Sequence, residues 1–347
     1  MATIKDVAKE ANVSVGTVSA VFNGKESIKP ENIIKVREAA QRLGYKPNYV
    51  WRMLKTCKTK TIGLIIPNIS NPFYPEFTRG AEDAAYKKGM TLFQCNSDSN
   101  EDKELSYVEA LISKSVDGIV IVKSQQTMKR LMEIATDCKL VLVDSNISAK
   151  DKFDIVESND RGGVESAMKL FFQYGHEKIA YICGSMESQS SRNRLKTYKD
   201  ALEKSGLIVD ESLIKSTTYN WYGGYAAMMD LLKQGNIPTA VMCANDLIAM
   251  GAIRALKERK IRVPRDMSVI GYDDIDQASY CSPYLTTVHQ LIYEMGAASV
   301  DLLVQRINEG KSGIDHKVNI CFDAQLIERE TVSYASSIID KYMHIRY

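Results

Sequence analysis

The sequence has no Cys-x-x-Cys pair and only four histidines, at positions 176, 289, 316 and 344. Its seven cysteines are odd in number, widely spaced and apart from the histidines, so we expect neither a disulfide framework nor a metal site. Most of them, such as Cys183 and Cys243, stand between apolar residues, where a free cysteine behaves as a small buried hydrophobe.

Long apolar runs are also missing. The longest ones, such as Ile62 to Pro67, have the length of a strand and fall well short of the roughly 20 residues that span a bilayer. The first residues, MATIKDVAKEANVS, contain no apolar core of a signal peptide. We therefore expect a soluble protein of the cytoplasm with no membrane partner.

Nucleotide-binding and catalytic motifs are absent as well. Gly162-Gly163 and Gly223-Gly224 lack the spacing and the following lysine of a phosphate loop, so we assign them to turns and helix packing. The histidines form no Ser-His-Asp set, and His176, in YGHEKIA, stands where a strand begins. We expect no enzyme, no catalytic residue and no cofactor.

Length and charge divide the chain unevenly. Its 347 residues suggest two or three domains. Residues 1–60 hold 12 Lys and Arg against 5 Asp and Glu, whereas the remainder holds 33 against 38, for a total net charge of +2. A basic head on an acidic body predicts that the head meets a polyanion, and nucleic acid is the obvious one.

The head has the pattern of three short helices. Thr3 can cap the first helix, and Ser14 can cap a second that ends before Asn23. A third helix begins near Pro30 and ends at Gly44. The first two are separated by so tight a turn that they predict a helix-turn-helix.

The body alternates β-rich runs with helical stretches. Residues 45–60 contain one proline and no acid, which is typical of a linker. From Thr61 the order is TIGLII, a helix near 76–88, MTLFQCN, a helix near 103–113 and DGIVIV. After Arg161 a helix through Leu170 precedes KIAYICG, a helix near 194–205, TAVMCAND, a helix through Lys257 and MSVIGYDDI. This α/β pattern predicts two lobes, each a doubly wound parallel sheet, with a ligand cleft at the carboxyl ends of the strands.

Seven segments in order resemble the lactose/galactose repressor family of bacterial regulators: TIKDVAKEANVSVGTVSAVFNGKESIKPE, LGYKPN, TIGLIIPNISNPFY, SRNRLKTY, NDLIAMGAIRALK, GYDDI and LTTVHQ. The resemblance covers essentially the whole chain. It implies a helix-turn-helix domain at 1–47, a hinge helix at 48–59 and a periplasmic-binding-protein-like effector and dimerisation domain at 60–347. Within that domain it implies an N-lobe of about 60–160 and 290–320 and a C-lobe of about 161–289 and 321–340.

In that family the second helix lies in the major groove of double-stranded operator DNA. The resemblance assigns base reading to Val15, Gly16 and Ala20, although many members carry a larger polar side chain at the last position. Small apolar groups can contact a thymine methyl but form no bidentate hydrogen bonds, so the operator cannot be named. The other candidate DNA contacts in the head are Thr3, Lys5, Ser14, Thr17, Ser19, Asn23 and Tyr45. Alternatively, these polar side chains only cap and solvate the helices.

The linker resembles the family's hinge helix, which folds on the operator and inserts a leucine into the minor groove. Here that residue is Leu54, with Lys55 beside it. The segment is less rich in alanine than usual and contains the large residues Trp51 and Met53. The alternative is that Leu54 is an ordinary apolar linker residue.

The resemblance also implies a small effector in the cleft, and the residue types suit a carbohydrate or sugar acid. Carboxylates and arginine can each hold two adjacent hydroxyls in a fixed fork. Tyr219 stands where an aromatic often stacks on a sugar face, and Trp221 is close enough to replace it. The full set of candidate effector contacts is Ser70, Asn71, Phe73, Asp144, Asp160, Arg194, Tyr219, Trp221, Asn245, Asp273 and Gln290.

These features together predict a homodimeric, allosteric regulator, usually a repressor of carbohydrate-metabolism genes, with induction and corepression both open. A sugar-binding transport protein would need a signal peptide and no basic head, and an enzyme would need convergent catalytic groups. Some family members bind a phosphocarrier protein through basic residues on the helix after the last crossover. This chain has Asp301 there, so we expect no such partner. The tail after Glu330 has too few heptad leucines for a tetramerising coiled coil, which favours a dimer.

Overall fold

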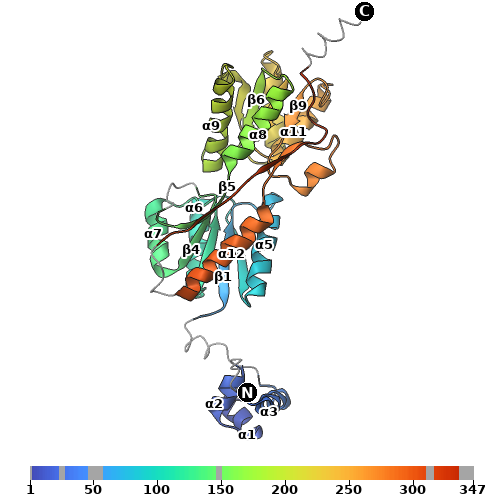
Figure 1. Ribbon diagram of the computed structural model, residues 1–347. Helices are drawn as coiled ribbons and strands as arrows, with labels where there is room; N and C mark the ends of the chain where they lie inside the picture. Colours follow the sequence, from blue (N-terminus) through green and yellow to red (C-terminus); the bar gives the residue numbers. More distant parts are fainter. Residues whose placement is uncertain (1, 23–27, 46–57, 146–150, 310–315, 336–347) are drawn as a thin grey trace, which may run out of the picture. The chain divides into compact units, whose positions relative to one another are not determined.

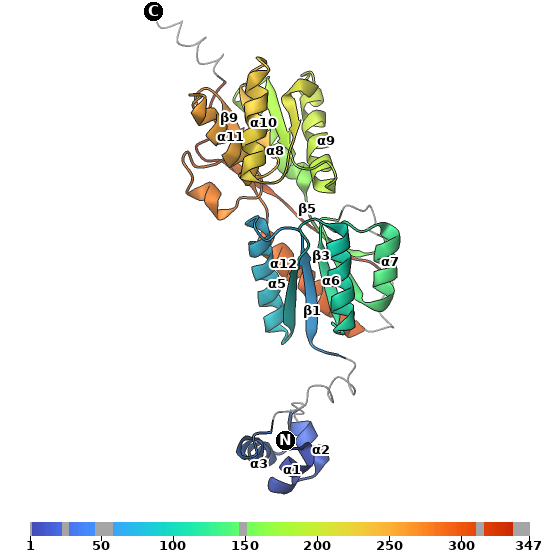
Figure 2. The ribbon, with the colours of Figure 1, turned by 180° about the vertical axis from the view of Figure 1, so that it is seen from behind.

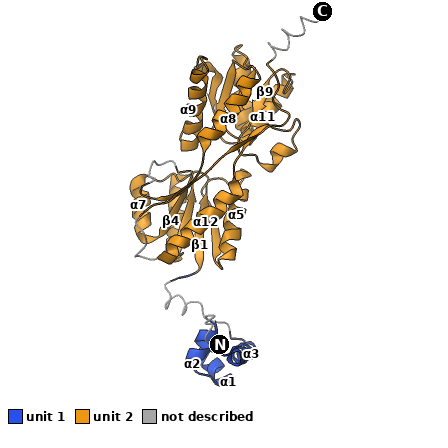
Figure 3. Cartoon of the chain, viewed as in Figure 1, with its two compact units in different colours: residues 1–59 blue, residues 60–347 orange. Residues whose placement is uncertain are grey.

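The structure is a computed structural model that describes residues 2–22, 28–45, 58–145, 151–309 and 316–335. It divides into two compact units, residues 1–59 and residues 60–347 (Figure 3). Most of the expected linker, at 46–57, lies outside the described residues.

The first unit contains the three expected helices, α1 (Ile4–Glu10), α2 (Val15–Phe22) and α3 (Pro30–Arg42). Their apolar faces meet in one small core that includes Val7, Val18 and Val36. The predicted caps are confirmed: Thr3 Oγ1 accepts from Asp6 N, and Ser14 Oγ accepts from Thr17 N at 3.0 Å. These caps satisfy amide groups that the first turn of a helix leaves without partners.

The N-lobe of the second unit is built on a six-stranded sheet with the order β11-β5-β4-β3-β1-β2, in which every pair is parallel. Along β1, Ile62 and Leu64 face one side of the sheet and Ile65 faces the other, and all are buried. Helices α5 and α12 cover the first side, and α6 and α7 cover the second (Figures 1 and 2). The strands are β1 (Thr61–Ile66), β2 (Thr91–Asn96), β3 (Gly118–Val122), β4 (Lys139–Val143), β5 (Asp154–Ser158) and β11 (Asn319–Phe322). The helices are α5 (Phe73–Lys87), α6 (Glu101–Ser113), α7 (Met128–Asp137) and α12 (Ile292–Glu309).

The C-lobe has a parallel four-stranded sheet with the order β7-β6-β8-β9. A separate antiparallel pair, β10 and β12, packs against the same core. The strands are β6 (Ile179–Cys183), β7 (Ile214–Ser216), β8 (Ala240–Cys243), β9 (Ser268–Ile270), β10 (Thr287–His289) and β12 (Gln325–Ile327). The helices are α8 (Asp160–Gln173), α9 (Gln189–Lys204), α10 (Trp221–Lys233) and α11 (Asp246–Glu258), with 3-10 turns η1 (Glu211–Leu213) and η2 (Asp276–Ser279).

These lobes confirm the predicted fold class, a helix-turn-helix domain plus a body of two doubly wound parallel sheets. Two helix starts differ from the expectation. Helix α5 begins at Phe73 instead of near residue 76, and α9 begins at Gln189 instead of near residue 194. Arg194 is therefore inside a helix, where its neighbours fix the direction of its side chain.

The glycine pairs serve helix packing, as expected. A Cβ on Gly224 of α10 would lie 2.1 Å from the carbonyl oxygen of Ile248 in α11, so only glycine allows the two backbones to come so close. A Cβ on Gly163 of α8 would lie 2.5 Å from the hydroxyl of Tyr272. The second contact brings α8 against the residue that follows β9, beside the candidate site.

Buried cysteines match the expectation in part. Cys138, Cys183 and Cys243 are free and buried. Cys321, by contrast, is exposed on the edge strand β11. Among the described residues, no helix has the length and apolar composition needed to cross a membrane.

The chain passes between the two lobes at three places. They lie between β5 and α8, between β10 and α12, and between β11 and β12 (Figure 1). Residues at these crossovers can contact both lobes, and Asp160 and Gln290 are among them.

Candidate DNA interface and effector cleft

The start of helix α2 presents its predicted base-reading residues to solvent. Val18 and Val21 turn into the three-helix core, whereas Val15 and Gly16 are exposed. Val15 keeps 41% of its surface exposed although it is aliphatic. Ala20 is half-buried. An exposed aliphatic group at the start of this helix is available to a thymine methyl in the major groove.

Several of the polar candidates in the head already have partners. The hydroxyls of Ser14 and Thr17 lie 2.9 Å apart, and Thr3 caps α1. Lys5 is exposed, Ser19 is half-buried, and the Tyr45 ring packs against Phe22 with 5.8 Å between centroids. Asn23, Leu54 and Lys55 lie outside the described residues. The capping interpretation therefore holds for Thr3 and Ser14, and a DNA contact would use the remaining hydrogen-bonding capacity of these hydroxyls.

In the second unit, Arg194 is the centre of the candidate site. Its side chain is only 2% exposed, and its Nε donates to Asp160 Oδ1 at 2.7 Å. One Nη donates to the carbonyl oxygen of Ala244 at 2.7 Å and lies 3.9 Å from Asp273 Oδ1. Burial opposes the charge of the guanidinium, but Asp160, above all, holds the pKa of Arg194 well above its usual range. This arginine is a fixed positive charge.

Tyr272, which was not among the residues predicted from the sequence, supports this arginine. The guanidinium carbon of Arg194 lies 3.6 Å from the centre of the Tyr272 ring. The Tyr272 hydroxyl donates to Asp160 Oδ1 at 3.4 Å. The residue stands directly before the acidic pair of GYDDI, but a tyrosine after a buried strand is usually a core residue, so its position gave no signal.

Asp273 and Gln290 form a second buried pair. Gln290 Nε2 donates to Asp273 Oδ1 at 2.6 Å, and Gln290 Oε1 has no partner among the described residues. Burial raises the pKa of Asp273 to about 6, although Arg194 and Lys123 act in the opposite direction. Asp273 has a φ of 110°, which a non-glycine residue rarely adopts. Such backbone conformations concentrate at functional sites.

Asn245 and Tyr219 add two more unused polar atoms. Asn245 caps α11 through its Oδ1, which accepts from Ile248 N at 3.0 Å, and its buried Nδ2 has no partner in the described part of the chain. The buried hydroxyl of Tyr219 has no partner there either. Buried polar atoms in proteins almost always have a hydrogen-bond partner, so these mark hydrogen-bonding capacity left for a ligand.

The N-lobe contributes Asp144 and a residue that the sequence analysis missed, Lys123. Asp144 follows β4 with a φ of 46° and accepts from Ser158 N at 3.3 Å. Burial raises the pKa of its carboxyl above the usual range, whereas Lys123 lowers it. Lys123 follows β3 with a φ of 50°, and its Nζ lies 5.4 Å from the ring centre of Phe73 and 5.6 Å from that of Tyr219. Its position directly after a strand is the signal that could have identified it.

The structure therefore brings residues of both lobes together, and we call them the interlobe cluster. Its members are Phe73, Lys123, Asp144, Asp160, Arg194, Tyr219, Asn245, Tyr272, Asp273 and Gln290.

Tyr219 and Trp221, which were alternatives, are in different environments. Tyr219 lies over Lys123 and packs on Gly184, where a Cβ would lie 2.1 Å from its ring. Trp221 begins α10, is 42% exposed and stacks on Tyr225 at 5.7 Å. The arrangement favours Tyr219 and not Trp221 as the aromatic of the site.

The loop after β1 lies beside the cluster. Asn71 is buried, and its Oδ1 accepts from Phe73 N at 3.1 Å, which fixes the start of α5. Ser70 is exposed and lines a cavity of about 380 Å³ between this loop and the residues around Asp274 and Gln277. Both lobes contribute to the walls of this cavity, and no member of the interlobe cluster lines it.

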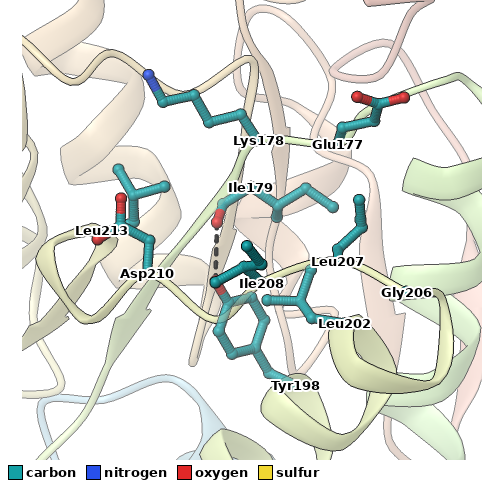
Figure 4. Close-up of a pocket in the computed structure, with 10 residues that line it drawn as sticks. All are labelled: Glu177, Lys178, Ile179, Tyr198, Leu202, Gly206, Leu207, Ile208, Asp210 and Leu213. Carbon is teal, nitrogen blue, oxygen red and sulfur yellow. Dashed lines mark hydrogen bonds between the residues drawn. The ribbon is translucent and has the colours of Figure 1, made fainter.

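A second cavity, of about 360 Å³, lies in the C-lobe between the start of β6 and the end of α9 (Figure 4). Tyr198 crosses its wall and donates from its hydroxyl to the carbonyl oxygen of Ile179 at 2.7 Å. Its other lining residues include Leu202, Leu207 and Ile208. None of the predicted effector residues lines it, so it is not the predicted cleft.

Comparison with known proteins identifies both units. Residues 3–48 match the model of the bacterial regulatory proteins, lacI family, and residues 168–332 match the periplasmic binding protein-like domain. The chain is 35% identical over 332 residues to the HTH-type transcriptional repressor PurR of Haemophilus influenzae (strain PittEE), covering 96% of this chain and 99% of that one. The chain belongs to the LacI family.

Solved structures of the LacI family agree. A lac repressor dimer bound to operator and the anti-inducer ONPF aligns with a TM-score of 0.84 at 26% identity, covering 96% of this chain and 99% of that one. The complex of the transcriptional regulator CelR with cellobiose aligns with a TM-score of 0.73 at 28% identity, covering 95% and 100%. This member of the LacI family is a DNA-binding transcriptional repressor and not an enzyme.

Proposed function

We propose that this repressor binds a sugar-type effector at the interlobe cluster and that the effector changes its affinity for operator DNA. The observation that carries the proposal is the set of buried polar atoms without partners among the described residues, on Tyr219, Asn245 and Gln290, around the fixed guanidinium of Arg194. A ligand with several hydroxyl groups can satisfy both donors and acceptors of this kind. The cellobiose bound to CelR supports a carbohydrate.

The crossovers supply a mechanism for control. Asp160 begins α8 directly after one crossover, and Gln290 follows β10 at another. A ligand that contacts these residues and the N-lobe favours one angle between the lobes. It changes operator binding only by its different affinity for the two states, so the favoured state decides between induction and corepression.

For the head, we infer that α2 enters the major groove and that Val15, Gly16 and Ala20 read base edges. Lys5, Thr17, Ser19 and Tyr45 contact the sugar-phosphate backbone, which supplies affinity and little sequence information. Leu54 and Lys55 remain the predicted hinge contacts.

We further propose that the protein is a homodimer in the cytoplasm, with one head on each half-site of a near-palindromic operator. The lac repressor dimer on its operator supports this arrangement. We still expect no phosphocarrier partner. Asp301 is exposed on α12 and pairs with Lys88 at 2.9 Å. An acid at this position repels an acidic or phosphorylated partner.

The test is a selection of random-sequence duplex DNA by the full-length protein, followed by a screen of neutral sugars, sugar acids and purine bases for effects on the enriched site. We expect a palindrome with a flexible central step, and at least one sugar or sugar acid that changes binding. Failure to enrich any sequence would contradict the assignment of the base-reading residues. A response to a purine base alone would contradict the sugar-type effector.

A further inference from the structure

Lys123 is the one lysine found in the interlobe cluster, and its ammonium lies between aromatic rings of the two lobes. Phe73 comes from α5 of the N-lobe, and Tyr219 precedes α10 of the C-lobe. The residue follows β3 with a φ of 50°. A residue other than glycine adopts this left-handed backbone conformation only at a cost in free energy. The surrounding fold therefore holds the Lys123 backbone in a conformation that it would not prefer by itself.

Among the described residues, no oxygen atom accepts a hydrogen bond from this ammonium, and Lys123 is half-buried. An ammonium has three N–H donors and no acceptor. Within the described part of the chain, Lys123 Nζ forms no hydrogen bond or ion pair with a protein oxygen, and it faces the two aromatic rings. Aromatic faces attract a cation, but they accept none of its hydrogen bonds in the way that an oxygen does.

Arg194, the other cation of the cluster, is in the opposite state. Asp160, Asp273 and the carbonyl oxygen of Ala244 surround its guanidinium. The carboxylates of Asp160 and Asp273 offset the charge of Arg194, although its two hydrogen bonds use only two of its five N–H groups. Lys123 differs from Arg194 because, among the described residues, no carboxylate lies within ion-pair distance of its ammonium.

The charges that face Lys123 leave room for a ligand anion. Burial works against its charge, but Tyr74, Asp144 and Tyr219 together hold the pKa of Lys123 above its ordinary value, so the ammonium stays charged. Asp144 lies beyond ion-pair distance, and its Oδ1 accepts from Ser158 N. Burial also raises the pKa of Asp144, which weakens it as a counter-charge.

We propose that Lys123 binds an anionic group of the effector, which makes the effector class a sugar acid, such as an aldonic or uronic acid, and not a neutral sugar. This inference rests on the proposed function, because it assigns the chemistry of the same cleft. The carboxylate of the acid accepts from the ammonium between the two rings. Its hydroxyl groups meet the unpartnered atoms of Tyr219, Asn245 and Gln290. A charge-assisted hydrogen bond is roughly twice as strong as a neutral one, so this contact dominates the choice between an acid and its neutral analogue.

The test measures binding of matched pairs to the full-length protein by calorimetry. The pairs are galacturonate with galactose, glucuronate with glucose, and gluconate with glucitol. We expect one acid to bind at least about 30-fold more tightly than its neutral partner, because loss of one partner of a buried charge pair costs about that much or more. Lys123→Met should remove this preference and leave the weak binding of the neutral partner within about threefold.

Two further variants make the result specific. Lys123→Arg should restore most of the preference for the acid, because it returns the charge. Lys114→Met, which removes an exposed charge at the end of α6, should leave both affinities unchanged. Unfolding midpoints and operator binding without ligand show whether each variant is folded.

The outcomes separate this inference from the proposed function. A neutral sugar that binds as tightly as its acid, or a preference for the acid that survives in Lys123→Met, overturns the role of Lys123. An acid that binds through Lys123 without any effect on operator affinity supports the inference and contradicts the proposed control of DNA binding. Binding by none of the sugars and acids contradicts both.

Discussion

Arg194 Nε lies 2.7 Å from Asp160 Oδ1, and this ion pair is almost completely shielded from solvent. Arg194 comes from α9 and Asp160 from the first turn of α8, so the pair joins two helices of the C-lobe at the edge that faces the N-lobe. The Tyr272 ring beneath the guanidinium and the nearby Asp273 complete the surroundings. Each of these two charges can be buried because the opposite charge of its partner offsets the cost of removing it from water.

Substitution Arg194→Met should therefore lower the free energy of unfolding by about 3–5 kcal/mol, because it leaves Asp160 and Asp273 buried without their cation. Urea denaturation measures this loss. The double variant Arg194→Met with Asp160→Asn should recover at least about 1 kcal/mol of it, since one uncompensated charge is gone. Asp160→Asn alone should be measured too. If the losses of Arg194→Met and Asp160→Asn simply add in the double variant, Asp160 and Arg194 do not stabilise each other. Neither variant should respond to effector.

Tyr219→Ala should weaken effector binding about tenfold, because the ring that faces the ligand site is lost. Trp221→Ala is the matched control, since its ring is exposed and stacks on Tyr225 along α10. It should leave the affinity within about twofold. Calorimetric titration of both variants with the same effector measures these affinities. A larger loss of affinity in Trp221→Ala than in Tyr219→Ala would mean that the site includes α10.

The stability of the protein should fall with rising pH through the titration of Asp273. Its pKa is about 6 in the folded protein and 3.8 ordinarily, so between these values the folded state keeps a proton that the unfolded state has lost. The extra stability is fully present below about pH 4 and is lost as the pH rises through about 6. Relative to Asp273→Asn, the wild-type free energy of unfolding should drop by about 2 kcal/mol from pH 4.5 to pH 6.5. Parallel pH profiles for the two proteins would exclude this role.

Val15→Ala should reduce operator affinity about fivefold through the loss of methyl contacts with thymine, and stability should change by less than about 0.5 kcal/mol. The control is Ile34→Ala on α3, which also removes an exposed aliphatic side chain, 58% exposed. It should change neither quantity. Binding to the selected operator and to random DNA should be compared, because an equal loss on both would point to a general effect and not to base reading.

Much of the head and the sheets follows from local patterns. Thr3, Ser14 and Pro30 mark helix starts by their own chemistry, and the buried runs of β1 and β3 can only be strands inside a layered fold. Helix α10 was missed because Gly223 and Gly224 lower helix propensity, and their packing against α11 overrides it.

The candidate site was predictable only where a residue has an obvious polar role. Arg194 and Asp273 stood out as charged residues in family motifs and Asp160 as an acid at the start of a helix, and the structure brings the three together. A lysine directly after a strand is often a solvated surface residue, so the position of Lys123 was a weak signal, and its role became clear when the fold placed the Tyr219 ring over it. Tyr272 was hidden for the same reason, since its contact with Arg194 joins two distant segments of the chain.

The three crossovers between the lobes also limit how this protein can be recombined. Neither lobe is one continuous stretch of chain, so a chimera that exchanges the C-lobe needs junctions near 158–160, 289–292 and 322–325. Two of those junctions fall on Asp160 and Gln290, which belong to the interlobe cluster. Ligand preference therefore cannot be transplanted with either lobe alone, whereas the head, which ends before residue 60, can be exchanged with a single cut.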